Sequence, residues 1–258
     1  MVPSAMPKSK YIAPALDKGL RILKFLADTP AGATSAEIAE ALGHSKPELY
    51  RMLVALERYN YIRRDELHGG YVATARMFEL GLRNAERHRL LGAALPILQS
   101  LSRATGQSCH VNVISREEIV VVLRVESETS IGFSVKVGLR VPALEGTSSR
   151  VFFAFSSRLR QAEWLRFLRS KSDRPATRRF LQEAAAAKAQ GYLRRSSVSA
   201  DGVVDIVSPI LAESRPLATL VVPFMEHVHN PASEDEVIQA TRAAAEQISQ
   251  MLSELGSG

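Results

Sequence analysis

The sequence lacks the features that mark membrane proteins and secreted proteins. No apolar run approaches the roughly 20 residues that a membrane-spanning helix needs. The first residues hold two lysines but no apolar segment behind them, so we expect no secretory signal. Cys109 is the single cysteine, which excludes an intrachain disulfide and a multi-cysteine metal site. We therefore expect a cytoplasmic protein with no membrane partner, no metal and no cofactor.

Signatures of several common enzyme classes are missing as well. The chain has no Walker A loop, no GxSxG turn and no HExxH helix. Cys109 and His110 are adjacent, so in a strand they would point to opposite faces and could not pair as nucleophile and base. His227 and His229 could share a face next to Glu226 and hold a metal, but no ligand beyond this trio stands at a recognisable spacing. We expect no catalytic residue, and a small-molecule-binding enzyme is the alternative.

The composition is that of a two-domain globular protein with a positive charge. The chain has 258 residues, of which 46% are hydrophobic and 23% charged, and its net charge is +6. Residues 1–90 hold 14 Lys and Arg against 10 Asp and Glu, and the remaining residues hold 19 against 17. The positive excess is denser near the N-terminus, which permits a polyanionic partner.

Two capping boxes around one glycine turn predict a pair of helices near the N-terminus. An amphipathic helix over 13–28 comes first. Residues 34–37 (Thr-Ser-Ala-Glu) then open a short helix, and residues 45–48 (Ser-Lys-Pro-Glu) open a longer one, with Gly43 between them. This is the spacing of a helix-turn-helix, whose second helix can lie in the DNA major groove.

The longer helix and the segment behind it favour contact with DNA. Its apolar stripe turns Tyr50, Arg51 and Arg58 outward, where they suit phosphates and base edges. Two short strands over 61–65 and 71–73, joined through a Gly-Gly turn, predict a wing. A winged helix that binds protein is the alternative. The predicted DNA-binding residues are Thr34, Ser35, Ser45, Lys46, Pro47, Glu48, Tyr50, Arg51, Arg58, Arg63 and His68.

These motifs resemble the IclR family of bacterial transcriptional regulators. The resemblance is carried by ALDKGLRILKFLA, HSKPELYRMLVALERYNYI, GLRVPALEGTSSRVFFAF and DGVVDIVSPI. It implies an effector-controlled, sequence-specific regulator of a catabolic operon, which binds double-stranded DNA at a near-palindromic operator as a homodimer or tetramer. Pro47 and Glu48 depart from the family's small hydroxyl residues, and Asp205 stands where a cysteine is common.

The resemblance also implies an α+β fold with four segments. Strand-like runs at 111–114, 119–125, 131–135, 205–208 and 218–222, mixed with helical runs at 88–105, 148–155, 161–168 and 180–190, agree with an α/β second domain. A capping box at Ser233 opens a final helix. The segments are a disordered arm (1–10), a winged helix-turn-helix (11–74), a linker helix (75–89) that pairs with a second subunit or packs within its own chain, and a GAF-like effector-binding domain (90–255).

The resemblance places an effector pocket at the start of the helix near residue 147. A Gly/Ser/Thr-rich helix start presents free N–H groups to a polar ligand. Asp205 lies between apolar residues, so its carboxylate needs a partner. Either a neighbouring group satisfies it, or it accepts a hydrogen bond from a hydroxyl or amine of an aromatic or hydroxylated effector. The predicted effector-binding residues are Gly146, Thr147, Ser148, Ser149, Asp205 and Ser208.

Overall fold

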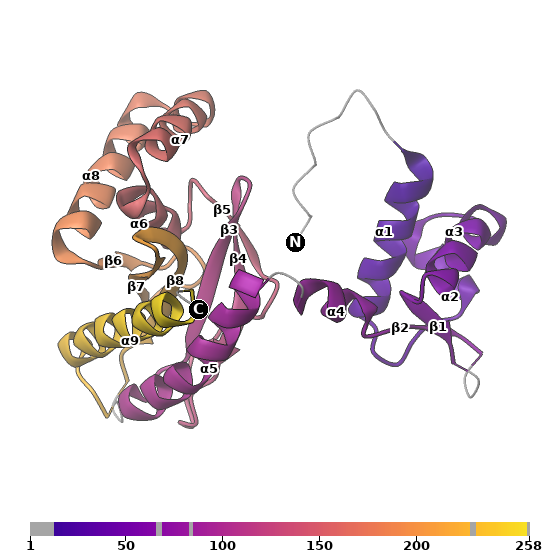
Figure 1. Ribbon diagram of the computed structural model, residues 1–258, viewed down its shortest axis with the longest axis horizontal. Coiled ribbons are helices and arrows are strands. Elements are labelled where there is room, and N and C mark those ends of the chain that lie inside the picture. Colours follow the sequence, from indigo (N-terminus) through magenta and orange to yellow (C-terminus); the bar gives the residue numbers. More distant parts are fainter. Residues whose placement is uncertain (1–12, 66–68, 83–84, 228–230, 257–258) are drawn as a thin grey trace. The chain divides into compact units, whose positions relative to one another are not determined.

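The computed structural model describes residues 13–65, 69–82, 85–227 and 231–256. They form two compact units that divide between Ala85 and Glu86 (Figure 1). The predicted arm at 1–10, His68 and His229 lie outside the described residues. None of the helices in the described ranges is long and apolar enough to cross a membrane.

The first unit is a bundle of short helices with a two-stranded hairpin. Its elements are α1 (Pro14–Ala27), α2 (Ser35–Leu42), α3 (Lys46–Arg58), β1 (Ile62–Arg64), β2 (Tyr71–Ala73) and α4 (Arg76–Leu82). Apolar residues from the first three helices and the hairpin share one core, which includes Ile22, Leu26, Ile38, Leu49, Leu53 and Ile62. The predicted order of helix, helix-turn-helix and hairpin is confirmed.

The turn between α2 and α3 has the predicted chemistry. Thr34 caps α2, because its hydroxyl accepts a hydrogen bond from the Glu37 N–H at 3.3 Å while the Glu37 carboxylate accepts one from the Thr34 N–H at 2.7 Å. Gly43 ends α2 with a φ of +68°, a left-handed conformation that side chains rarely adopt. The chain can therefore enter α3 after one tight turn.

The second unit is built on one antiparallel sheet of six strands in the order β5-β4-β3-β8-β7-β6. Side chains alternate between its two faces. Cys109 and Val111 of β3 lie in the core on one face, whereas Val207 of β7 and Val221 of β8 lie in the core on the other. The strands are β3 (Cys109–Ser115), β4 (Glu118–Val125), β5 (Arg140–Pro142), β6 (Leu193–Ser196), β7 (Val203–Ala212) and β8 (Arg215–Met225).

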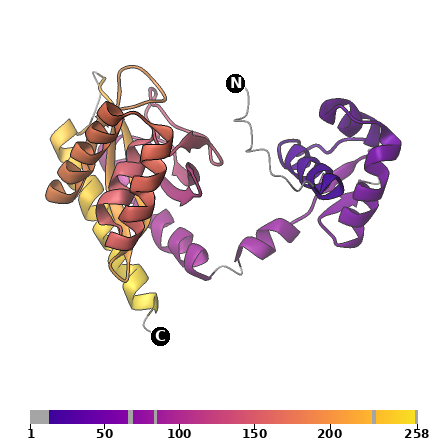
Figure 2. The same ribbon diagram turned by 90° about the horizontal axis from the view of Figure 1, so that it is seen from above.

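Helices cover both faces of this sheet (Figure 1). α5 (Ala85–Thr105) and α9 (Glu234–Gly256) bury their apolar stripes against the face that holds Cys109. α6 (Thr147–Phe155) packs on the opposite face, and α8 (Arg174–Gln190) packs on α6. Figure 2 shows α7 (Arg158–Lys171) beside α8, and the Trp164 ring stacks on the Phe180 ring with 6.1 Å between centroids.

Two details of the second unit differ from the sequence prediction. Residues 131–135 form no strand, because Phe133 and Val135 line a cavity instead of pairing with a neighbouring strand. The short strands β5 and β6 were not predicted. Of the predicted linker helix over 75–89, residues 76–82 are helical in α4 and residues 85–89 are helical in α5, and residues 83–84 lie outside the described residues.

Candidate DNA-binding surface and ligand cavity

The outward face of α3 carries polar side chains without partners in the described part of the chain. Leu49 and Leu53 are buried in the core of the first unit, as the apolar stripe predicts. On the other side, Tyr50 is 58% exposed, and Arg51 and Arg58 are exposed with neither an ion pair nor a side-chain hydrogen bond among the described residues. Ser45, Lys46 and Pro47 are also exposed, and Thr34 and Ser35 are half-buried at the start of α2.

Glu48 serves the helix itself. Its carboxylate accepts hydrogen bonds from the Ser45 N–H at 2.9 Å and from the Ser45 hydroxyl at 3.0 Å. The Lys18 ammonium of α1 lies 2.9 Å from its other oxygen. The Ser45 N–H, together with Lys18, lowers the pKa of Glu48 to about 2. The carboxylate is therefore stabilised at this end of α3, first by the capping hydrogen bonds and then by the neighbouring cation.

This arrangement predicts a pH-dependent stability. The pKa of Glu48 is lower in the folded chain, at about 2, than its ordinary 4.5, so the stabilisation is present above pH 4.5 and is lost as the pH falls toward 2. We expect Glu48→Gln to destabilise the protein at neutral pH and to differ less from the wild type at pH 3. Denaturant unfolding followed by circular dichroism measures this difference. A difference that stays constant from pH 7 to pH 3 would contradict the role given to the carboxylate.

The wing is fastened to the helices and leaves one arginine available. β1 pairs antiparallel with β2, and Tyr71 of β2 forms a bridge with Ala33. Gly70 permits this approach, because a Cβ there would lie 2.9 Å from the Ala33 carbonyl. Arg64 is held over the Tyr71 ring at 5.5 Å. Arg63 is exposed; its guanidinium donates to the Arg64 carbonyl at 3.3 Å but forms no ion pair in the described ranges, so it can reach a phosphate.

A small cavity of about 40 Å³ lies in the second unit at the start of α6. Gly146, Thr147, Ser148 and Asp205 are in its wall, as predicted. Ser149 and Ser208 are not. The Ser149 hydroxyl turns back to the Gly146 carbonyl at 2.6 Å. The remaining lining residues include His110, Asn112, Ile119, Val121, Phe133, Val135, Leu139, Val141, Ser197, Val198, Ser199, Val221 and Pro223.

The placement of Ser208 in the pocket was wrong because of strand parity. Asp205 and Ser208 are three residues apart on β7, so their side chains point to opposite faces of the sheet. Ile206 and Ile210 belong to the core under α5 and α9, which places Ser208 on that side as well. Asp205 faces α6, where the Thr147 hydroxyl donates to its carboxylate at 2.8 Å. Burial raises the pKa of Asp205, against the opposing effects of Thr147, Ser197 and Arg195.

Two polar residues of the cavity wall were not predicted. His110 and Asn112 alternate with the buried Cys109 and Val111 on β3, so they share the face toward α6. Burial lowers the pKa of His110 to about 3, which keeps its ring neutral. The Asn112 amide donates to the Ser148 hydroxyl at 3.0 Å, but its buried Oδ1 has no partner among the described residues. Period-two alternation along β3 could have shown this pair.

Arg150 on α6 was not predicted either, and it holds the loop that forms the cavity wall. Its side chain is 4% exposed and forms an ion pair with Glu183 of α8 at 2.9 Å. The same guanidinium donates to the Leu144 and Gly146 carbonyls, both at 2.8 Å, and lies 4.6 Å from the centre of the Phe180 ring. These contacts fix the turn from which Thr147 and Ser148 reach the cavity.

The adjacent Cys109 and His110 point to opposite faces of the sheet, as predicted. Cys109 is fully buried in the core, and burial raises the pKa of its thiol to about 12. His110 lies in the cavity wall. The two cannot act as a nucleophile and its base. The described residues also contain no group of three or more His, Cys, Asp or Glu that could hold a metal ion.

The fold and the two sites define a helix-turn-helix regulator with a separate ligand-binding domain, and comparisons with known proteins agree. A family model described as "IclR helix-turn-helix domain" matches residues 15–66, and one described as "Bacterial transcriptional regulator IclR C-terminal" matches residues 83–250. The chain belongs to the IclR family. It is a transcriptional regulator with a DNA-binding helix-turn-helix domain and a C-terminal effector-binding domain.

Relatives in sequence are named regulators. The HTH-type transcriptional regulator XynR of Escherichia coli K12 is 25% identical over 221 residues, covering 81% of this chain and 85% of the relative. The glycerol operon regulatory protein of Streptomyces coelicolor is 22% identical over 200 residues, covering 76% of this chain and 78% of the relative.

Solved structures share the fold. The IclR protein of Thermotoga maritima has a TM-score of 0.69 at 24% identity, covering 92% of this chain and 98% of the other. An IclR homologue of Microbacterium hydrocarbonoxydans, solved in complex with 4-hydroxybenzoate, has a TM-score of 0.74 at 20% identity, with the same two coverages. The predicted fold, a winged helix-turn-helix followed by an α/β domain, is confirmed.

Proposed function

We propose that this regulator controls a catabolic operon in the cytoplasm and binds a near-palindromic operator through the outward face of α3. The observation that carries the proposal is that Arg51 and Arg58 are exposed on this face without a charged partner among the described residues. Guanidinium groups bind guanine edges and phosphates, and Tyr50 beside them adds a hydroxyl and a ring. Lys46 and Ser45 at the tip of the helix suit the phosphate backbone.

A gel-shift titration tests this function. The full chain should shift DNA from upstream of its own coding region, and its affinity should fall steeply with salt because phosphate contacts release counterions. Failure to shift this DNA at low salt, with and without candidate metabolites, would overturn the proposal. Binding that is insensitive to salt would instead favour a protein partner for the winged helix.

The wing should contribute affinity without sequence preference. Arg63 lies on β1 of the wing, and its exposed guanidinium suits a phosphate. We expect Arg63→Ala to weaken binding to operator and random DNA by the same factor and to lower the salt slope by about 1 for each subunit bound. Fluorescence anisotropy titrations over a salt series measure both quantities. Selective loss of operator binding would assign Arg63 to base contacts.

We also propose that the protein works as a homo-oligomer. A helix-turn-helix unit covers one half-site, so a two-fold operator needs two of them. Within the first unit, α4 leaves apolar side chains uncovered: Phe78 is 67% exposed and Met77 is 49% exposed. A second subunit would bury them, which favours pairing through the linker over packing within one chain.

We propose that a hydroxylated small molecule binds in the cavity at the start of α6. The domain would serve as a receptor for this molecule and would not catalyse a reaction. The carboxylate of Asp205 accepts hydrogen bonds, the free Oδ1 of Asn112 accepts another, and the neutral ring of His110 serves as donor or acceptor. A ligand hydroxyl can satisfy each of these groups. Because Asp205 already places a carboxylate beside the first turn of α6, a ligand carboxylate at that end would meet a like charge.

Apolar residues complete the cavity wall and favour an aromatic ligand. Phe133, Val135 and Val141 contribute to it. A hydroxylated aromatic compound, 4-hydroxybenzoate, is the ligand with which the Microbacterium homologue was solved, and this supports the choice. A cavity of about 40 Å³ must widen to hold such a ring. The segment over 131–139, which belongs to no helix or strand, supplies part of the wall that would move.

Calorimetry tests the role of Asp205. A thermal-shift screen of aromatic acids, hydroxylated aromatics and short organic acids first identifies a ligand. Asp205→Ala should then weaken it about tenfold or more, because a hydrogen bond to a charged group is lost. Asp201→Ala is the matched control, since Asp201 is exposed and outside the cavity wall. If Asp205→Ala bound the ligand with unchanged affinity, the Asp205 carboxylate would have only a structural role.

A further inference from the structure

The positive charge of the protein is concentrated in two helices of the second unit. Residues 158–190, which span α7 and α8, hold nine Lys and Arg against three Asp and Glu, a net charge of +6. The other 225 residues hold 24 of each kind and are neutral in sum. The strongest concentration of positive charge therefore lies outside the helix-turn-helix. Dividing the chain at residue 90 concealed it, because residues 91–258 as a whole hold only two more Lys and Arg than Asp and Glu.

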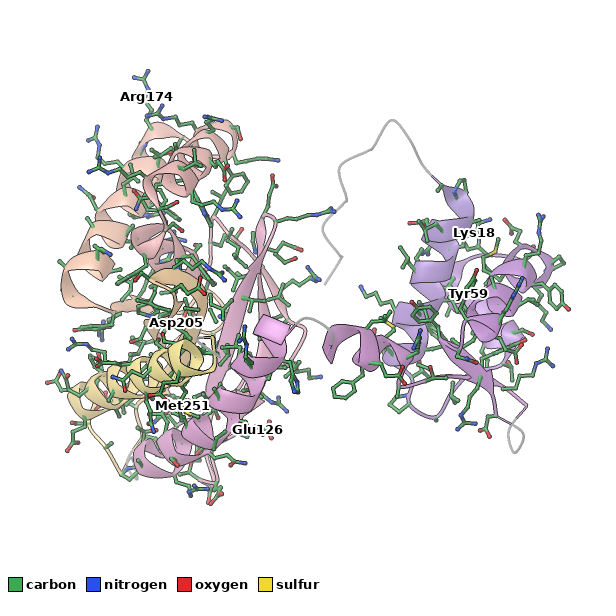
Figure 3. The ribbon with its side chains drawn as sticks, in the orientation of Figure 1. Lys18, Tyr59, Glu126, Arg174, Asp205 and Met251 are labelled. Carbon is green, nitrogen blue, oxygen red and sulfur yellow. The ribbon has the colours of Figure 1, made fainter. Side chains whose placement is uncertain are left out.

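Six arginines of this segment are exposed and have no ion pair or side-chain hydrogen bond among the described residues. The other three cations are engaged: Arg160 with Glu163 at 2.9 Å, Lys171 with Glu117 at 3.8 Å, and Lys188 over the Phe155 ring. Figure 3 shows the side chain of Arg174 pointing away from the body of the unit. We call this set the α7–α8 arginine surface: Arg158, Arg166, Arg169, Arg174, Arg178 and Arg179.

These arginines are not needed to build the core. The apolar sides of α7 and α8 pack through Trp164, Leu168 and Phe180, which the six guanidinium groups do not contact in any described interaction. Like charges at this density repel one another. A shared counter-charge, supplied from outside the chain, would relieve this repulsion.

We propose that the α7–α8 arginine surface binds the phosphate backbone of duplex DNA beyond the segment that the helix-turn-helix contacts. The proposal rests on the DNA-binding function of the protein, which keeps duplex DNA near this domain. All six free cations are arginines, whose planar guanidinium binds phosphate oxygens in pairs. The two aromatic rings of α7, Trp164 and Phe167, are half-buried, so the surface offers no exposed platform for the stacked bases of a single strand.

The test compares two triple variants of the full chain. Arg166→Gln/Arg169→Gln/Arg178→Gln removes three charges from the arginine surface, and Arg103→Gln/Arg116→Gln/Lys136→Gln removes three exposed charges elsewhere in the same unit. Affinity is measured over a salt series for two duplexes. The short duplex carries only the two half-sites that the helix-turn-helix units contact, and the long duplex extends beyond them on both sides.

On the long duplex, the arginine-surface variant should lose about 0.9 of the salt slope for each phosphate contact removed, up to about 2.7 for each subunit bound. Its slope on the short duplex should equal that of the wild type, and the control variant should match the wild type on both. An unchanged slope on the long duplex, or an equal loss in the control, would overturn the proposal. The proposal would also be overturned if poly-glutamate bound tightly and this binding required the three arginines, whereas DNA binding did not require them. If the wild type did not bind the short duplex, the DNA-binding role proposed for the helix-turn-helix would be wrong.

Discussion

Replacing Arg150 with methionine is expected to lower the free energy of unfolding of the second unit by about 3 kcal/mol. The Arg150 side chain is 4% exposed, and its removal leaves Glu183 without its 2.9 Å partner. The Leu144 and Gly146 carbonyls also lose a donor inside the protein, which costs free energy for each buried acceptor. Glu183 is 23% exposed and lies 3.6 Å from Arg195, so water and a second cation limit the loss.

Denaturant unfolding followed by tryptophan fluorescence measures this effect. Trp164 is the single tryptophan and stacks on the Phe180 ring, over which Arg150 also lies, so its signal reports the second unit. Arg160→Met is the matched control, because Arg160 forms an ion pair of the same length with Glu163 while 72% exposed. An exposed pair contributes about 0 to 1 kcal/mol. Equal effects of the two substitutions would show that burial of Arg150 does not matter.

Replacing Arg51 with alanine is expected to lower the affinity for the operator by about 10- to 100-fold, equivalent to about 1–3 kcal/mol. Arg51 is on the outward face of α3 and has neither an ion pair nor a side-chain hydrogen bond among the described residues, so the substitution removes no such internal interaction. The loss on random DNA should be smaller, because base-edge contacts exist only on the operator.

Anisotropy titrations of both DNAs at one salt concentration give the ratio of the two affinities. Arg103→Ala, an exposed arginine of α5, should leave that ratio unchanged. A uniform loss for Arg51→Ala together with a selective loss for Arg63→Ala would exchange the roles of α3 and the wing.

The first unit could be predicted almost completely because its signals are local. Each capping box lies within four residues, and Gly43 marks the turn by its own conformation. The outward face of α3 follows from helical periodicity. The ion pair between Glu48 and Lys18 could not be predicted. Lys18 lies 30 residues away from Glu48, and only the packing of α1 on α3 brings the two together.

The site in the second unit was harder to predict from the sequence, because its residues come from several strands of the sheet. Asp205 stood out as an acid among apolar residues, but His110 and Asn112 became part of the same wall only through pairing of β3 with β8 and of β8 with β7. Short edge strands such as β5 carry few residues and hence little pattern. The sequence does not distinguish Arg150 from other helix arginines, because only the packing of α8 on α6 brings Glu183 beside it.

A hydroxyl-radical footprint of the DNA upstream of the coding region tests whether the outward face of α3 reads this DNA. We expect two protected half-sites, related by two-fold symmetry and spaced about one helical turn or a multiple of it apart. At the lowest protein concentration that saturates the wild-type footprint, Arg51→Ala should weaken or abolish the protection. An absent footprint, or one that Arg51→Ala leaves intact, would contradict the claim that the outward face of α3 reads this DNA.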